Sequence, residues 1–545
     1  MIRSPTARVF AGWLLLSAIV LGIEAPPAGE PGLYYDEAFL AQQGRDFLEP
    51  DRLTRHPPGT SSTYVLGRRF PLSNSSYLGS LKSQLLIPPL ALFGASVTTL
   101  RIATLSTALI ALLFTLLWAR RIFGTPQALA TGALVALDPS FVFFGACEWG
   151  PYTTMLLCRS IGLYSLTVGW QRRRTGLLVL GGLALGLGVY ARADFVIIGI
   201  ASAVGLVAAR GRHLLREVRE RPLPIAAALT AVVVGAIPML IGAQDLLATQ
   251  AGIADRGDLV YRLQVLWSTL DGSHFHRVMH TGGIFERIFD APGPASLFGL
   301  ATAAAVGVAA GTLLRQSEPR ITFLLVTVVV LGVAMVLLPG AVRAHHMLNL
   351  LPFTHLLVAA VGTHLAGTRG ARIAASVALV LVLASEARVT WQTREEIAET
   401  GGRGRWSNSL DAFAAEIGTD PDAVAVSLDW GFHEPLLFLT TKQSLIEPIW
   451  TIPQLLRLGR SWIHPGDANH RYLVREVPYD LFRLGPKLLA TARELGPDLA
   501  EIRTHTDRRG DVAFYSVRFT APHQLVFSGE FEVRFQGERQ PRRPR

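Results

Sequence analysis

Residues 321–342 read ITFLLVTVVVLGVAMVLLPGAV, a run of twenty-two positions without a single Asp, Glu, Lys or Arg. A helix needs about 20 apolar residues to cross the roughly 30 Å hydrocarbon core of a membrane, so this run predicts a membrane-spanning helix. A further segment near 152–171 is broken only by Arg159. The other runs free of charged residues are 9–23, 102–119, 122–137, 175–191, 195–209, 222–244, 291–314, 344–368 and 373–385. Together they predict about eleven transmembrane helices.

The charged residues divide the 545-residue chain into two parts. Only 17% of all residues are charged, against the roughly 25% that is usual in soluble globular domains. Residues 1–387 hold 50 charged side chains, whereas residues 388–545 hold 42, of which 21 are basic and 21 acidic. We therefore expect an all-α polytopic membrane domain over 1–387 and a small soluble domain over 388–545.

The tail from 388 alternates strand-like and helical patterns. Residues 423–428 and 512–517 are rich in β-branched and aromatic side chains, and helical patterns lie near 410–417 and 485–496. This order predicts a small mixed α/β domain, and the composition of residues 540–545 predicts a disordered end.

The net charge of +10 lies entirely in the apolar part, in short gaps between the apolar runs. With the N-terminus in the cytoplasm, these gaps fall on the cytoplasmic side, as the positive-inside rule requires. The tail and two large loops, 24–85 and 244–290, then lie outside. The arginines that carry this pattern are Arg3, Arg8, Arg120, Arg121, Arg172, Arg173, Arg174, Arg210, Arg212, Arg216, Arg219, Arg221, Arg315, Arg320, Arg369 and Arg372. A topology signal explains them better than a nucleic-acid surface does.

Two features bear on the compartment. Residues 9–23 follow two arginines and could be a cleaved signal peptide, although we favour a retained anchor, which holds the next segment at the membrane. Cys147 and Cys158 are eleven residues apart, too far along a helix for a disulfide, and two cysteines supply no zinc site. Lysine is scarce beside arginine, which is typical of a GC-rich genome and favours the inner membrane of a bacterium.

An acidic pair, Asp36 and Glu37, follows the first apolar run at the start of a helical pattern. A carboxylate at the outer membrane face could be a general base on an acceptor hydroxyl or amine, or Asp36 could simply cap the helix. Glu148 lies on the same predicted face. It could share a site with Asp36 or join it in binding a divalent cation, or it could be a solvated loop acid.

Cations on that face are few. Arg192, Arg343 and Lys82 could each bind a lipid phosphate or could anchor the chain at the interface. Two histidines, His345 and His346, follow Arg343, but adjacent histidines point to different sides of a helix and do not suit a metal. Arg159 lies inside a predicted crossing, where an ionisable side chain is functional or pairs with another helix.

Four stretches carry a resemblance to a known group: Tyr35 to Ala38, Tyr77 to Lys82 with its continuation to Arg101, Asp138-Pro139 with Glu148 to Pro151, and Arg343 to Pro352. The chain resembles the GT-C superfamily of polytopic glycosyltransferases. In particular, it is similar to the family of dolichyl-phosphate-mannose-protein mannosyltransferases and bacterial aminoarabinose transferase-like proteins. Glu148 stands where many relatives have aspartate, and His345-His346 stands where an Arg-Tyr pair is common.

The resemblance implies transfer of a sugar from a polyprenyl-phosphate donor to a lipid, glycan or protein acceptor on the extracytoplasmic face. It implies that Asp36 is the catalytic base and that Arg343 and Lys82 balance the charge of the departing lipid phosphate. We expect Glu37 to orient the site, and Arg192 and His346 to bind the donor phosphate as well. Glu148 would be a second acidic residue, and any divalent metal would bind at Asp36 and Glu148.

Two other functions compete with this one. A transporter or flippase of a lipid-linked or envelope substrate would also be polytopic, but it should bury several charged groups near mid-membrane, where the sequence offers clearly only Arg159. A non-catalytic assembly or sensor protein would use the membrane part as an anchor, for which eleven crossings are excessive.

Overall fold

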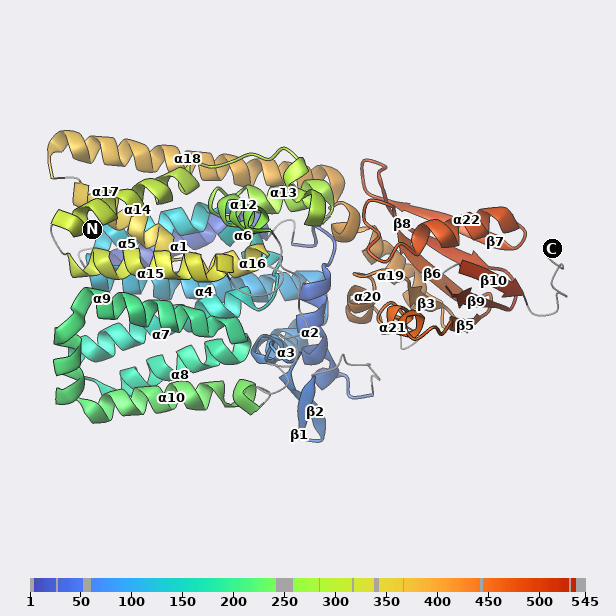
Figure 1. Cartoon of the computed structure of the whole chain (residues 1–545), viewed down its shortest axis with the longest axis horizontal. Helices are drawn as coiled ribbons and strands as arrows, with labels where there is room; N and C mark the ends of the chain where they lie inside the picture. The colour runs from blue at the N-terminus through green and yellow to red at the C-terminus, as the bar shows by residue number, and fades with distance from the viewer. Residues whose placement is uncertain are drawn as a thin grey trace.

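The computed structural model describes residues 4–25, 28–51, 60–241, 258–283, 285–315, 318–337, 343–365, 367–441, 445–528 and 531–535. It consists of a helical bundle and a sheet-containing C-terminal region at one end of the bundle (Figure 1). The helices of the bundle are α1 (Pro5–Glu24), α4 (Val97–Phe123), α5 (Thr125–Leu137), α6 (Pro139–Ala146), α7 (Tyr152–Arg172), α8 (Thr175–Ala191), α9 (Val196–Glu220), α10 (Pro222–Ile241), α14 (Phe298–Arg315), α15 (Pro319–Leu337), α16 (Ala344–Met347), α17 (Phe353–Leu365) and α18 (Arg369–Thr400).

The predicted number of crossings is not confirmed. Seven helices in the described residues are long and apolar enough to span a membrane, and the bent pair α5–α6 makes an eighth if it counts as one span. The predicted runs 152–171 and 175–191 do form the helices α7 and α8, and residues 298–314 of the run 291–314 lie in α14. However, α8 has only 17 residues, and α7 is long but more polar, so neither of them is among the seven.

The first predicted outer loop is ordered into three pieces at the end of the bundle that faces the C-terminal region (Figure 1). Helix α2 (Tyr35–Leu48) is followed by the antiparallel hairpin of β1 (Ser61–Val65) and β2 (Arg68–Ser73), and α3 (Leu81–Phe93) leads into α4. In the second predicted loop, 244–257 and 284 lie outside the described residues. The described residues of the loop include α12 (Leu259–Leu270), α13 (Ser273–Thr281) and a short 3₁₀ turn, Phe285–Asp290.

The bend between α5 and α6 measures 61° and has a local cause. Pro139 has no N–H and cannot continue α5, so the chain restarts with Pro139 as the first residue of α6. The carboxylate of Asp138 caps the new helix by accepting a hydrogen bond of 2.7 Å from the Ser140 N–H. The turn directs α6 and the following loop, with Glu148, toward the end of the bundle that carries α2.

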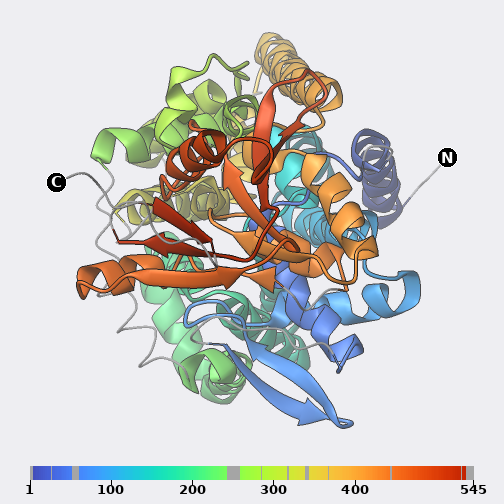
Figure 2. The ribbon, with the colours of Figure 1, turned by 90° about the vertical axis from the view of Figure 1, so that its right-hand side faces the viewer.

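The C-terminal region has the predicted mixed α/β composition. Its five-stranded sheet has the order β4-β3-β6-β8-β7, with β3 parallel to both neighbours, and a three-stranded antiparallel sheet has the order β10-β9-β5. Figure 2 views the molecule from this side, with the sheets in front of the bundle. The elements are α19 (Ser409–Thr419), β3 (Val424–Ser427), α20 (His433–Leu439), β4 (Leu445–Ile446), α21 (Ile452–Arg457), β5 (Trp462–Gly466), β6 (His470–Arg475), α22 (Gly485–Leu495), β7 (Ala500–Thr506), β8 (Val512–Phe519), β9 (His523–Phe527) and β10 (Phe531–Phe535).

The boundary predicted at 387/388 lies inside a helix. Helix α18 continues to Thr400, so one continuous helix joins the bundle to the C-terminal region. The disordered end predicted at 540–545 lies outside the described residues. The largest hydrophobic core fills the bundle and includes Trp406, and a second core fills the sheets of the C-terminal region. Both cysteines are free, as expected from their separation, and both are buried.

Candidate functional site

Asp36 lies in the first turn of α2, where its side chain is half-buried. Tyr34 is the N-cap residue, so the alternative that Asp36 caps the helix is wrong. Among the described residues no hydrogen bond or ion pair engages the Asp36 carboxylate. Burial raises the pKa of Asp36 from 3.8 to about 7, although the Arg192 guanidinium opposes this shift. Asp36 is therefore an unengaged acid that can exchange a proton near neutral pH.

The neighbouring Glu37 is fully engaged. Its two oxygens accept hydrogen bonds of 2.9 and 3.0 Å from Arg101 of α4, and both side chains are buried. Arg101 also donates to the carbonyls of Pro31 and Gly32, at 2.6 and 3.1 Å. This bidentate contact ties the start of α2 and the preceding loop to the bundle. Glu37 thus holds the backbone that carries Asp36.

Lys82 and Glu148, predicted separately as a phosphate ligand and a second acid, contact each other. The Lys82 Nζ lies 2.6 Å from Glu148 Oε2, and both side chains are buried. Thr153 donates to the other Glu148 oxygen through its N–H and its hydroxyl, and Lys82 donates to Thr104 at 2.8 Å. The pair links α3 to the loop before α7.

Arg192 and His346 form a second cluster around Asp194. The Asp194 Oδ2 lies 2.8 Å from Arg192 Nη2 and 3.0 Å from His346 Nδ1, and the Arg192 guanidinium also contacts the His346 ring. The backbone of Arg192 and Leu78 forms an isolated β-bridge, and the Ala193 N–H donates to the Tyr77 carbonyl at 3.1 Å. Two predicted phosphate ligands from distant segments therefore meet at the end of the bundle.

Arg343 caps the short helix α16 and is half-buried. Its Nη1 donates to the Tyr261 hydroxyl of α12 at 3.1 Å. The positive charge of Arg343 acts on Tyr34, which lies two residues before Asp36 in the chain, so Arg343 belongs to the same region. Arg159 lies deeper in the bundle and donates to the Asn349 carbonyl at 2.7 Å, which favours pairing with another helix.

Aromatic side chains of the C-terminal region cover the residues beside Asp36. The ring of Trp406 stacks on Tyr34 with centroids 4.0 Å apart and planes at 4°, and the ring of Trp430 lies 4.7 Å from that of Tyr35. Trp149, from the loop that holds Glu148, contacts both Tyr34 and Trp406. The C-terminal region and the bundle thus share one aromatic cluster.

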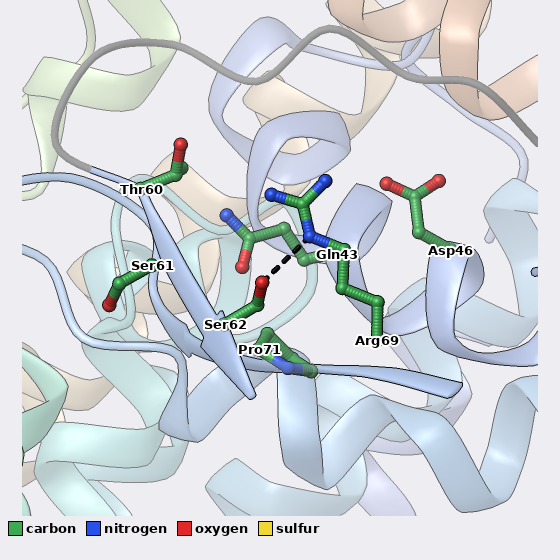
Figure 3. A pocket seen from close by; sticks show the side chains of 7 residues that line it. All are labelled: Gln43, Asp46, Thr60, Ser61, Ser62, Arg69 and Pro71. Carbon is green, nitrogen blue, oxygen red and sulfur yellow. Dashed lines mark hydrogen bonds between the residues drawn. The ribbon is translucent and has the colours of Figure 1, made fainter. Parts of the chain in front are cut away.

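A polar pocket lies further along α2, between this helix and the β1–β2 hairpin (Figure 3). In it, Arg69 donates to the Ser62 hydroxyl at 2.7 Å. Gln43 lies seven positions after Asp36, about 10 Å along the helix. The lining residues are Gln43, Asp46, Thr60, Ser61, Ser62, Arg69 and Pro71. None of them is a predicted site residue.

Several residues that shape the site were not singled out from the sequence. Arg101 ends one of the four motifs, but no role was predicted for it. No role was predicted for Asp194, Trp406 or Trp430 either. The hydrogen-bond partners of Arg101 lie at least 64 residues away from it in the sequence. His346, which contacts Asp194, lies 152 residues after it. Nothing in a single sequence indicates such pairings. A charged residue beside an apolar run was the available signal for Arg101.

The chain is similar to one protein family over part of its length and to several solved structures over most of it. Residues 88–241 match the model of the family described as dolichyl-phosphate-mannose-protein mannosyltransferase, whereas no curated protein sequence matches the chain. The solved structure of ArnT from Cupriavidus metallidurans bound to undecaprenyl phosphate is similar over 93% of this chain and 97% of its own, with 12% identity and a TM-score of 0.55. Its apo structure gives 13% identity, the same TM-score, and coverages of 93% and 98%.

An oligosaccharyltransferase from Archaeoglobus fulgidus, solved in complex with Zn and sulfate, is similar over 80% of this chain and 62% of its own. Its TM-score is 0.50 and its identity 13%. At identities this low, the structural similarity establishes a shared fold. The resemblance predicted from the four sequence motifs is confirmed, and the chain has the GT-C fold of the polytopic membrane glycosyltransferases.

Proposed function

We propose that this protein is a glycosyltransferase that moves a sugar from a polyprenyl-phosphate donor to an acceptor at the extracytoplasmic face of a bacterial plasma membrane. The observation that carries the proposal is the Asp36 carboxylate, which no described residue engages and whose pKa of about 7 suits a base. The match to a mannosyltransferase family and the likeness to ArnT, solved with undecaprenyl phosphate, support a lipid-phosphate donor.

In the proposed reaction, Asp36 accepts the proton of an acceptor hydroxyl or amine as that atom attacks the anomeric carbon. The bond between the anomeric carbon and the phosphate oxygen breaks, and the polyprenyl phosphate leaves with the electron pair. A phosphate needs no proton in order to leave, so one carboxylate suffices where glycoside hydrolysis uses two carboxyl groups.

Arg192 and Arg343 are the cations that we assign to the departing phosphate, because guanidinium groups match phosphate oxygens. Asp194 and His346 orient Arg192 by the contacts described above. Lys82 has a different assignment, since its ammonium group is paired with Glu148. We assign this pair to positioning: it joins α3 to the loop that carries Trp149, and so fixes one wall of the aromatic cluster.

The C-terminal region is assigned a role in covering the site and in meeting the acceptor. Trp406 and Trp430 contact the two tyrosines that precede Asp36. Exclusion of water by such a cover strengthens the electrostatic interactions inside a site. On the predicted topology, with the N-terminus in the cytoplasm, this region lies outside the membrane.

The test is sugar transfer in liposomes that contain the full chain and a panel of radiolabelled polyprenyl-phosphate sugars with lipid, glycan and peptide acceptors. We expect the intact protein to transfer one of these sugars and Asp36→Asn to lose transfer. Asp51→Asn, an exposed acid just after α2, is the matched control and should retain it. Undiminished transfer by Asp36→Asn would refute the assigned base. Lipid flipping without transfer from any donor would favour the transporter.

A further inference from the structure

Three metal-ligating side chains meet inside the bundle, away from the proposed base. Asp138 lies at the bend between α5 and α6, His355 in the first turn of α17 and Glu386 midway along α18. Their exposed fractions are 2%, 0% and 0%. One carboxylate oxygen of each acid and one ring nitrogen of the histidine all lie within 4.8 Å of one another. In the part of the chain that the structure describes, this is the one convergent group of three or more such residues.

The contacts within the group leave ligand positions open. His355 Nε2 lies 2.9 Å from Asp138 Oδ2, and the other ring nitrogen lies 3.2 Å from the Thr354 hydroxyl. The His355 ring also stacks on Phe298, with centroids 4.2 Å apart. The ring is therefore held from two sides, with Nε2 directed at Asp138. Such a contact on the far nitrogen is typical of metal-bound histidines.

Of the three residues, Glu386 gives the strongest indication of a bound ligand. Both of its carboxylate oxygens are buried without a hydrogen-bond partner. No lysine or arginine among the described residues pairs with Glu386 or with Asp138. A buried carboxylate that lacks hydrogen bonds and a counter-charge is strongly unfavourable, because desolvation costs several kcal/mol per ion. Two acids placed together therefore require a bound cation or a proton.

The types of the three ligand atoms indicate which cation the group would bind. One imidazole nitrogen with two carboxylate oxygens suits Zn²⁺ and its neighbours in the first transition row. Calcium prefers six to eight oxygen ligands, and magnesium prefers octahedral oxygen with several waters. In a tetrahedral zinc site with bonds of about 2.0–2.1 Å, ligand atoms are about 3.3 Å apart, so the observed spacings need only small side-chain adjustments.

We propose that Asp138, His355 and Glu386 bind one Zn²⁺ ion, with water at the fourth position. The ion joins the α5–α6 bend to α17 and α18, which also pack through an apolar cluster that includes Phe298. Its role is structural: it fixes the angle at which α6 leads to the loop of Glu148 and Trp149. The site is distinct from Asp36 and Glu148, where the sequence analysis placed any metal.

The test uses the untagged full chain in detergent, stripped with a chelator and reloaded with Zn²⁺ alone. Elemental analysis should find close to one Zn²⁺ per chain, and the thermal unfolding temperature should rise by several degrees on reloading. Glu386→Gln and His355→Asn should lose both effects. Asp429→Asn, which changes another buried acid with an unpartnered oxygen, is the matched control and should keep both.

A second measurement needs no variant. Co²⁺ loaded in place of Zn²⁺ should give the intense visible absorption of a tetrahedral site in the wild-type chain. The proposal is overturned if the wild type retains no more metal than Glu386→Gln. It is equally overturned if infrared spectra of the wild type show a protonated carboxyl band that Glu386→Gln removes, because the cluster would then hold a proton.

Discussion

Asp36 combines two properties that rarely coexist in a side chain, partial burial and the lack of any polar partner among the described residues. Its raised pKa sets the expected pH dependence. A general base acts in its ionised form, so kcat/KM should fall about tenfold per unit as pH decreases below about 7. The measurement is a pH–rate profile of sugar transfer in liposomes.

The Arg192 charge lowers the pKa of Asp36, so Arg192→Gln should shift the acidic limb of that profile to higher pH. Asp51→Asn should leave the limb in place. A profile in which the wild-type limb lies near pH 4 would contradict the assignment, since an unperturbed aspartate titrates there.

Glu37 has the opposite character, because its carboxylate is fully paired in the interior. We expect Glu37→Gln to destabilise the protein by about 3–5 kcal/mol, since it leaves the Arg101 charge buried and unpaired. Thermal unfolding in detergent measures the loss. The matched control lies at the other end of α2, where Arg45 pairs with the C-cap residue Glu49: the Glu49 side chain is 41% exposed, so Glu49→Gln should cost under about 1 kcal/mol. Equal losses in the two variants would refute the structural role.

At the scale of elements, the approach of α3 to α8 depends on one glycine. A Cβ atom added to Gly79 would overlap the carbonyl oxygen of Tyr190, so the two backbones are close enough to exclude any side chain. Gly79→Ala should therefore separate the segment before α3 from the end of α8 and disturb Arg192, which follows Tyr190 by two residues. We expect a lower unfolding temperature together with weaker donor binding, both measured in detergent.

The matched control for Gly79→Ala is Gly199→Ala in α9. Its added Cβ meets nothing within 4 Å, and alanine is the better helix former by roughly 0.5–1 kcal/mol. Gly199→Ala should leave stability unchanged or slightly raised. If Gly79→Ala behaves in the same way, the close approach does not matter for the site.

The elements show which features of a single sequence are informative. Apolar runs depend on local composition, so most of the described residues in each predicted run are helical, and Asp138-Pro139 marks the bend between α5 and α6. Lengths were less predictable: α18 continues past the charged residues at 386 and 388 because packing against α13 and α17 sustains it.

Individual residues of the candidate site could be predicted from the sequence, but the contacts between them could not. Asp36 was identified from its place at the start of a helix beyond the first apolar run. The contact of Lys82 with Glu148 joins residues 66 positions apart, and Glu386 marked only the end of the run 373–385. Such contacts depend on how helices pack, which their individual sequences do not specify.

The whole molecule is joined across the aromatic cluster, and Trp406 is its most deeply buried member from the C-terminal region. Trp406→Ala should destabilise the junction by about 3–5 kcal/mol and accelerate hydrogen exchange in residues 30–40, with reduced transfer. Trp450, which is 52% exposed, provides the control: Trp450→Ala should change stability by less than about 0.5 kcal/mol. Unchanged exchange in residues 30–40 of Trp406→Ala would show that the two regions are energetically independent.

The contact between Gly32 and the segment around Trp406 has a consequence for biosynthesis. The Gly32 N–H donates to the Trp406 carbonyl at 2.7 Å, and a Cβ at Gly32 would overlap the Ser407 backbone. The loop before Asp36 leaves the ribosome first but reaches its final conformation only after some 370 further residues have been synthesised. Pairings this distant in sequence form late. A nascent or truncated chain that lacks the segment around Trp406 therefore carries Asp36 without the aromatic cover over it.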